Sequence, residues 1–303
     1  MGSGILRIGA VVFVVWVGAD LGAGSAAVAR GTLVGTTSAT FLKIGTQARA
    51  MGLGEAVTSL ADGVSYVGYN PACVKIDGLA LTASHTALFD GVNLEDVTLG
   101  LAFGKSAGMI VRGNGILFDK TERTDISGNS LGTYSASSYS AGLGFYVRGG
   151  DLTFGLLGKT IQQNIAGFRA STMAADAGIR YLTPLPGITL GVSVLNVGRP
   201  VKFIAQEDEL PRALRAGIGA DFGYFRLGLD AVKYRDQDVF LSAGAEVTIF
   251  KALSFRAGYS NQSELSSPFK AGIGFRFSFI DLDYAYNAGD VFGATHRVSL
   301  TIR

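Results

Sequence analysis

The sequence predicts an all-β protein: a closed antiparallel transmembrane β-barrel of 14 strands with a small N-terminal helical hatch in its lumen. Three observations predict it. Mean hydropathy is high, at +0.33, yet beyond the first thirty residues no apolar stretch approaches the ~18 to 20 residues of a membrane-spanning helix. Apolar residues instead alternate with small or polar ones, the period of a strand with two different faces. Finally, long and short connections alternate along the chain.

The first 29 residues have the pattern of a secretory signal peptide. Arg7 precedes an apolar core at 8–19, and Ala27 and Ala29 suit signal peptidase, which predicts cleavage before Arg30. The alternative is an uncleaved membrane anchor. We expect residues 30–76 to form the hatch and residues 77–303 the barrel.

Composition argues against several classes of function. The 303 residues include 26 basic and 24 acidic side chains, spread along the chain, so no nucleic-acid partner is expected. One cysteine and two histidines cannot supply a disulfide or the usual four ligands of structural zinc. Gly158-Lys159-Thr160 lacks the earlier glycine of a phosphate loop, and Ser84 and His85, as neighbours on a strand, face opposite ways. We therefore expect no enzyme, no cofactor and no bound metal.

Fourteen segments show the alternation. In the segment at 268–277, Ile273 and Phe275 lie on one face while Gly274 and Arg276 lie on the other. An even number of strands permits antiparallel closure. The segments are 79–87, 96–103, 108–116, 139–148, 151–161, 172–182, 187–196, 212–222, 224–233, 238–248, 252–260, 268–277, 280–287 and 294–303.

The connections favour a membrane barrel over a soluble β-sandwich. Connections after even-numbered strands are tight, whereas those after odd-numbered strands include the long segments 119–138 and 198–211. Outer-membrane barrels have short periplasmic turns and longer extracellular loops. The first strand then runs outward, the C-terminus lies in the periplasm, and the protein lies in the bacterial outer membrane.

The charged residues of the strands lie opposite the apolar rows. A basic residue facing lipid at the bilayer midplane costs roughly 2 to 4 kcal/mol, so these rows must face the lumen. Both signs occur, which favours paired networks over an ion pore, and Asp281 and Asp283 are expected to pair with Arg276 and Arg297. Frequent glycines in the same rows leave room for the long side chains. The expected lumen network includes Asp176, Arg180, Arg215, Asp221, Arg276, Asp281, Asp283 and Arg297.

The segment before the first strand does not alternate. It is rich in alanine, has helix-like spacing around 54–60, and reaches a turn at Asn70-Pro71. Such a segment suits a hatch that occupies the lumen. Its motif residues are Arg49, Gly52, Gly54, Asp62, Asn70 and Pro71.

The hatch sequence at 41–62 and 69–72 resembles the start of the PorV/PorQ proteins, a branch of the FadL-like outer-membrane barrels. The resemblance covers nearly all of the chain after the signal and extends to 175–181, 191–198, 210–217 and 295–297. There are two departures. Cys73 stands where the family usually has glycine, so a left-handed backbone there would be strained, and the chain ends at Arg303 where the family tends to end in an aromatic residue.

The resemblance implies a role in type IX secretion, in which extracellular loops bind exported cargo proteins or secretion-system components. The candidate contacts are Phe203, Ile204, Glu207 and Glu209, although this loop would equally fit back over the barrel mouth. The alternative is FadL-like passive transport of hydrophobic small molecules, which requires an apolar pocket at the mouth, a movable hatch and a lateral opening. A third alternative is a structural barrel that binds no cargo. Outer-membrane lipid is an expected partner in every case.

His85 and His296 are expected near the outer ends of the first and last strands, which adjoin on closure. They fit either a metal or headgroup site at the rim or, more simply, membrane-interface residues among aromatic side chains.

Overall fold

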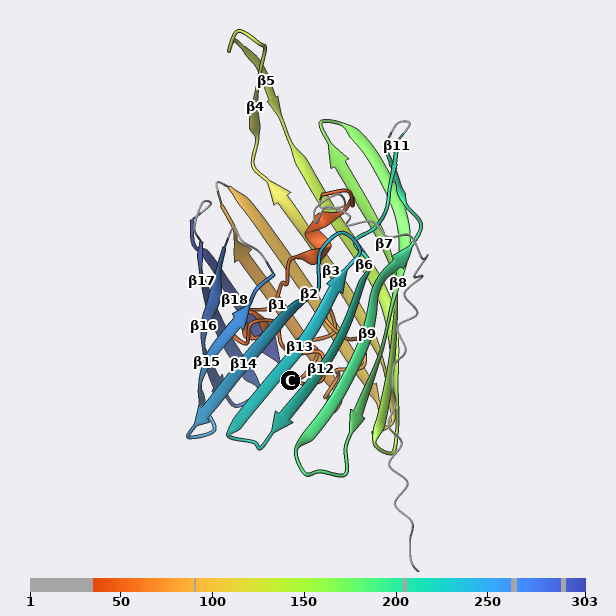
Figure 1. Ribbon diagram of the computed structural model, residues 1–303, viewed down its shortest axis with the longest axis vertical. Helices are drawn as coiled ribbons and strands as arrows, with labels where there is room; N and C mark the ends of the chain where they lie inside the picture. Colours follow the sequence, from red (N-terminus) through yellow and green to blue (C-terminus); the bar gives the residue numbers. More distant parts are fainter. Residues whose placement is uncertain (1–34, 90, 204–205, 263–265, 290–292) are drawn as a thin grey trace, which may run out of the picture. The chain divides into compact units, whose positions relative to one another are not determined.

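The computed structural model describes residues 35–89, 91–203, 206–262, 266–289 and 293–303; the predicted signal at 1–29 lies outside them. Fourteen antiparallel strands form one closed barrel, in which β1 pairs with β2 on one side and with β18 on the other (Figure 1). This confirms the predicted fold class. The barrel strands are β1 (Leu79–Ala87), β2 (Val92–Phe103), β3 (Ala107–Phe118), β6 (Ala136–Gly149), β7 (Leu152–Ile165), β8 (Phe168–Leu182), β9 (Ile188–Gly198), β12 (Ala213–Asp221), β13 (Phe225–Tyr234), β14 (Phe240–Ile249), β15 (Leu253–Ser260), β16 (Ser266–Phe277), β17 (Ile280–Gly289) and β18 (Thr295–Ile302).

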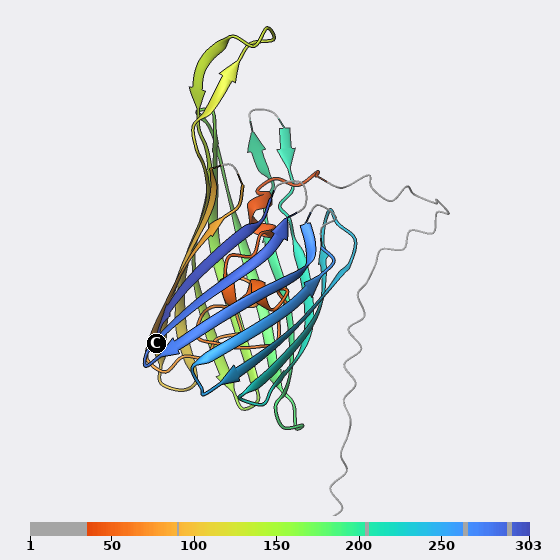
Figure 2. The same cartoon turned by 90° about the vertical axis from the view of Figure 1, so that its left-hand side faces the viewer.

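The two ends of the barrel differ in their connections. One end, here called the turn end, carries tight turns such as those at Gly150 and Gly223, whose positive φ values of 58° and 85° suit glycine. The other, the loop end, carries two extra ribbons where we expected loops: β4 (Thr121–Thr124) with β5 (Ser130–Tyr134), and β10 (Val201–Phe203) with β11 (Gln206–Asp208). The β4–β5 ribbon projects far beyond the rim (Figure 2). Longer loops face the cell exterior, so the loop end is extracellular.

The barrel exterior is apolar. In β15 the pattern alternates strictly, with Phe255 48% exposed on the outer face and Arg256 5% exposed on the inner. Exposed aromatic rings, including Phe222, Tyr224 and Phe250, gather at the turn end, as in the girdles of membrane barrels. A closed barrel with an apolar exterior and inward charges is a multi-pass barrel of the bacterial outer membrane.

The lumen is filled by the chain that precedes β1, here called the hatch. All residues from Thr46 to Val67 are buried, and the segment lies inside the barrel in both views (Figures 1 and 2). Its helices are short: η1, a 3-10 helix (Thr40–Lys43), and α1 (Ala48–Gly52), which packs against β15 to β18. Within the described residues, no helix has the length and apolar character needed to cross a bilayer.

Two expectations for the hatch are corrected. The helix-like spacing around 54–60 is not a helix; the helix ends at Gly52, and Gly54 and Glu55 both have positive φ, near 65°. Left-handed residues terminate a right-handed helix. The strain expected at Cys73 is also absent, because its φ is not positive among the described residues; its buried thiol donates to the carbonyl oxygen of Thr58 at 3.1 Å.

Candidate functional site

The hatch backbone crosses the inner wall over a row of glycines. Gly228, Gly244 and Gly258 lie directly opposite one another on β13, β14 and β15; we call them the glycine row. A Cβ on any of them would lie closer than 3.0 Å to backbone atoms of Leu53, Gly54 or Ala56. The glycines of the inward rows therefore make room for the hatch main chain as well as for long side chains.

The Asn70-Pro71 turn docks in the same way. Gly155 and Gly178 are cross-strand partners on β7 and β8, and a Cβ on either would collide with Pro71 or Asn70. The Asn70 side chain donates to the carbonyl oxygen of Thr58 at 2.7 Å, which ties the turn to the segment over the glycine row. Of the proposed hatch motif residues, Gly54, Asn70 and Pro71 lie against wall glycines, as do Leu53, Ala56 and Thr58 outside the motif.

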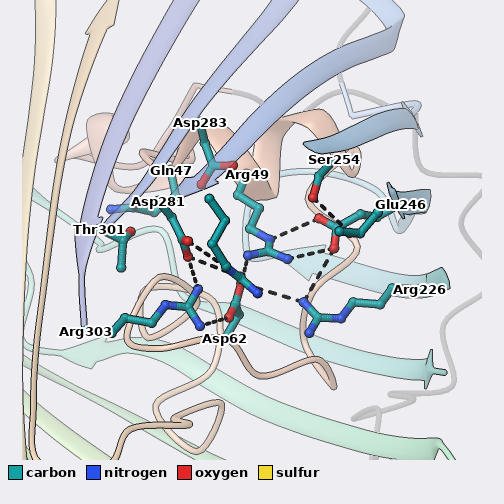
Figure 3. Close-up of polar contacts among 12 residues, drawn as sticks. Gln47, Arg49, Asp62, Arg226, Glu246, Ser254, Asp281, Asp283, Thr301 and Arg303 are labelled. Atoms are coloured by element: carbon teal, nitrogen blue, oxygen red, sulfur yellow. Dashed lines mark hydrogen bonds and ion pairs between the residues drawn. The ribbon is translucent and has the colours of Figure 1, made fainter. Parts of the chain in front are cut away.

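An ion-pair network joins the hatch to the wall at the turn end (Figure 3). Arg49 donates to both carboxylate oxygens of Glu246, at 2.7 and 3.1 Å, and also pairs with Asp62. Asp62 in turn pairs with Arg303 at 2.7 Å, and Arg226 lies 3.5 Å from Glu246. Arg49, Asp62 and Glu246 are buried, so each charge depends on its partners.

Asp281 and Asp283 extend this network along β17. Arg276 donates to Asp281 at 2.7 Å, as expected from the sequence, and Arg303 also pairs with Asp281. Asp283 pairs with Arg256 at 2.7 Å. Carboxylates held by guanidinium groups in this way are structural.

Arg297 does not join these aspartates, and that expectation is wrong. The register of β17 and β18 places it opposite Ala285, beyond Asp283. Its guanidinium instead lies 3.7 Å from Glu55 of the hatch and donates to Thr86 at 3.1 Å.

The middle of the hatch is held by Arg215 and Asp230. Asp230 accepts hydrogen bonds from the amides of Val57 and Thr58, at 3.1 and 3.0 Å. Arg215 lies 3.2 Å from Asp230 and donates to the carbonyl oxygen of Glu55 at 2.7 Å. These two wall residues satisfy hatch backbone groups that have no strand partner.

The remaining predicted lumen charges lie at three other places on the wall. Arg180 donates to the carbonyl oxygen of Ser59 at 2.7 Å, whereas Asp221 pairs with its neighbour Arg226 at 3.1 Å. Asp176 pairs with Lys159 at 2.7 Å, at the position where the β8–β9 register shifts between Ala175 and Ala177.

The shift leaves Asn196 of β9 with a positive φ of 59°. Its amide donates to Asp176 at 2.7 Å and its side-chain oxygen accepts from Lys159 at 2.6 Å. A buried polar clasp therefore closes the wall where the strand ladder is interrupted.

The loop-end half of the lumen has the opposite character. Inward-facing aliphatic side chains line it, and η1 of the hatch fills its centre, with Phe41 3% exposed. We call this lining the apolar vestibule. It consists of Val92, Leu94, Ile116, Ile161, Ala170, Ala174, Val201 and Leu210.

A short hatch segment, residues 37–43, is fastened across this mouth; we call it the strap. The amide of Ser38 donates to the carbonyl oxygen of Glu209 at 2.9 Å. Lys43 and Thr37 both donate to Asp236, at 2.5 and 2.9 Å, in the connection between β13 and β14. Sequence reasoning missed Asp236 and Lys43, because neither lies in an alternating segment nor belongs to a motif.

The predicted cargo contacts lie in two different environments, one partly buried and one exposed. Phe203 is partly buried and packs against the apolar vestibule, so the loop does fold back over the mouth. Glu207 and Glu209 are exposed and lie 3.4 and 3.6 Å from Lys202 and Arg235. Ile204 lies outside the described residues.

The two histidines occupy the outer rim but do not meet. His85 lies 2.6 Å from Glu95, whereas the ring of His296 lies 2.8 Å from the hydroxyl of Tyr284. In the described part of the chain no group of three or more His, Cys, Asp or Glu residues could hold a metal ion.

Little open space remains between hatch and wall. A cavity of about 30 Å³ lies beside Glu55, Tyr69 and Arg215, which is room for one or a few water molecules. The described lumen is therefore packed rather than hollow, and the vestibule is filled by Phe41 and its neighbours in the hatch.

Comparisons with known proteins show the fold. No family model matches the chain, and no curated protein matches it in sequence. Among solved structures it is similar to CymD, a monoaromatic hydrocarbon channel, with 13% identity, a TM-score of 0.62 and coverage of 85% of this chain and 96% of that one. The toluene transporter TodX of Pseudomonas putida has 15% identity and a TM-score of 0.61, covering 85% and 96%.

A FadL homologue of Pseudomonas aeruginosa has 10% identity and a TM-score of 0.58, covering 85% of this chain and 98% of that one. At these identities the likeness shows the fold alone: this chain shares the closed-barrel fold of these three outer-membrane structures. The narrower resemblance to the PorV/PorQ branch rests on the sequence.

Proposed function

We propose that the protein takes up hydrophobic small molecules passively from the cell exterior. The observation that carries the proposal is the apolar vestibule, an aliphatic lining at the extracellular mouth of a lumen whose remaining inner face is largely polar. Lining of this kind binds apolar ligands and offers nothing to ions or sugars. The names of the similar structures, a hydrocarbon channel and a toluene transporter, support the same class of substrate.

The route proposed beyond the vestibule leads sideways through the wall. The hatch fills the lumen below, whereas Ala174 of the vestibule is next to the register shift of β8 and β9. On the lipid side of the same wall, Gly158 and Met173 border a depression of about 510 Å³. The polar clasp of Asp176, Lys159 and Asn196 would have to open for a ligand to pass.

Probe binding tests the proposal. The purified protein in neutral detergent is titrated with the fluorescent apolar probe N-phenyl-1-naphthylamine. Ile161→Thr places a hydroxyl in the vestibule, so we expect the probe affinity to fall about tenfold, from a penalty of ~1–2 kcal/mol for an unpaired hydroxyl. The matched control is Ile110→Thr, because Ile110 is an equally buried isoleucine of another cluster in the lumen. Equal affinities in both variants, or no probe binding at all, would overturn the proposal.

A second candidate, capture of exported proteins, is supported by the β4–β5 ribbon. At its tip Ile126 is fully exposed and Leu131 is 56% exposed, which is an uncommon use of large apolar side chains in a projecting ribbon. Deletion of residues 121–134 should abolish co-purification of exported proteins with the barrel if this role is real. Unchanged recovery after the deletion would count against it.

A further inference from the structure

The lipid-facing surface of β9, β12, β13 and β14 contains an apolar groove. These strands lie side by side on one face of the barrel (Figure 1). In one cross-strand row, Ala216 and Ala231 lie opposite each other and are flanked by Val192 and Leu241. The small side chains form the floor of a groove of about 690 Å³, within the size range of ligand sites.

Basic side chains stand above the groove, on β13 and on the residues that flank β12 and β13 at the loop end. Lys233 follows Ala231 by two positions on β13, and Arg212 and Arg235 are cross-strand neighbours at the loop end, joined by a 2.9 Å backbone hydrogen bond. Lys233, Arg212 and Arg235 are all exposed. With a rise of ~3.4 Å per residue along strands tilted by 35–45°, they lie roughly 5 to 10 Å nearer the loop end than the alanine pair, on the side of the outer-leaflet headgroups.

These cations retain capacity for a ligand. Lys233 donates to the carbonyl oxygen of Gln237, which uses one of its three N–H donors. The pair of Arg235 with Glu209 is long, at 3.6 Å, and both side chains are over 40% exposed, so it is weak. Arg212 takes part in no ion pair among the residues that the structure describes.

We propose that this face binds one molecule of an outer-leaflet glycolipid that carries phosphate. Its acyl chain lies in the groove over Ala216 and Ala231, and its phosphate is held by Arg212, Lys233 and Arg235. The two halves of the site match the two halves of such a lipid: a floor that is almost wholly apolar, and guanidinium and ammonium donors that bind phosphate well. The site is separate from the vestibule and does not depend on the transport proposal.

Native mass spectrometry of the full-length protein, matured by export and purified in neutral detergent, tests the proposal with bisphosphorylated lipid A as the probe. We expect one lipid A per barrel. The double variant Arg212→Gln with Lys233→Gln should bind about thirtyfold more weakly, since each basic residue near a membrane surface contributes ~1 kcal/mol to attraction of anionic lipid. Filling the groove by Ala216→Leu with Ala231→Leu should also abolish the bound lipid, although it leaves every charge in place.

The matched control is Lys120→Gln with Arg123→Gln, which removes two exposed positive charges from the same end of the barrel and should leave binding unchanged. Dephosphorylated lipid A, a zwitterionic phospholipid and inorganic phosphate alone should each bind at least tenfold more weakly. Equal retention of the dephosphorylated lipid would show an unspecific lipid annulus and overturn the proposal. Binding unaffected by either site variant would overturn it as well.

Discussion

The two halves of the lumen hold the hatch by different means. Below the vestibule, the hatch backbone lies against the glycine row, and nearer the turn end buried arginines bind buried carboxylates. At the loop end, the strap is held by a few hydrogen bonds and by the ion pair of Lys43 with Asp236, and Phe41 fills the apolar vestibule. On the proposed function, a ligand would displace the hatch at the loop end while the turn end keeps it in place.

The largest effect is expected from the turn-end network. Glu246 is buried and accepts from Arg49 and Arg256, with Arg226 3.5 Å away. Glu246→Gln removes the carboxylate that these three guanidinium groups share. Arg49, Arg256 and Arg226 keep Asp62, Asp283 and Asp221, but the buried network is left with one positive charge in excess, and we expect a loss of about 3 to 5 kcal/mol in the free energy of unfolding. Urea titration, followed by the gel mobility of the unheated barrel, measures it.

Glu207→Gln is the control for that variant, because Glu207 makes an exposed ion pair with Lys202. Exposed pairs of this kind contribute about 0 to 1 kcal/mol. If both substitutions cost the same, the turn-end network does not hold the hatch and the contrast between the halves fails.

The glycine row predicts the next largest effect. Gly228→Ala would drive a methyl group into the Ala56 backbone, which cannot move without displacing the hatch. We expect a loss of about 1 to 3 kcal/mol, as for overpacked cores. Gly149→Ala, where a Cβ meets open space, should leave stability unchanged in the same urea titration. If Gly228→Ala left the free energy of unfolding unchanged, the hatch backbone would not lie against Gly228.

The sequence predicts the barrel much better than its contents. Alternation places each strand within a few residues, because the lipid solvates one face of every ribbon and so enforces period two. The hatch has no such external constraint. Its path is set by where the wall has glycine, and pairs such as Glu55 with Arg297 join residues more than 240 positions apart. Arg297, the expected partner of Asp283, shows the limit of the sequence. The face of the strand on which Arg297 lies was predictable, but its position along the strand relative to Asp283 depended on the register.

A substitution at Phe41 tests whether only the loop-end half of the hatch controls access of an apolar probe. Phe41→Ala empties part of the vestibule, so the fraction of molecules able to accept an apolar probe should rise, and the apparent affinity for N-phenyl-1-naphthylamine with it, by roughly three- to tenfold. Val57→Ala removes a fully buried hatch side chain near the glycine row and should not change probe affinity. A rise in both variants would show that loosening the hatch anywhere admits the probe, contrary to the proposed division.

The smallest effect is expected from the strap. Burial would raise the pKa of the Asp236 carboxyl, but hydrogen bonds from Lys43 and Thr37 outweigh it and hold the pKa below its usual 3.8. Because the folded state lowers this pKa, the contribution of Asp236 is complete above pH 3.8 and is lost as the pH falls through the folded-state value. Hydrogen exchange at the Ser38 amide should therefore accelerate under acid, while amides over the glycine row stay protected.

Asp236→Asn should give the accelerated exchange already at neutral pH, with a cost of about 1 to 2 kcal/mol in global stability, because the amide oxygen still accepts a hydrogen bond but the ion pair with Lys43 is lost. The acid dependence of the Ser38 amide should vanish in this variant. If it persists, another carboxylate fastens the strap, and Glu209, whose carbonyl oxygen accepts from Ser38, is the next residue to replace. Loss of the acid dependence would show that the contact between Asp236 and the strap controls exposure of the Ser38 amide.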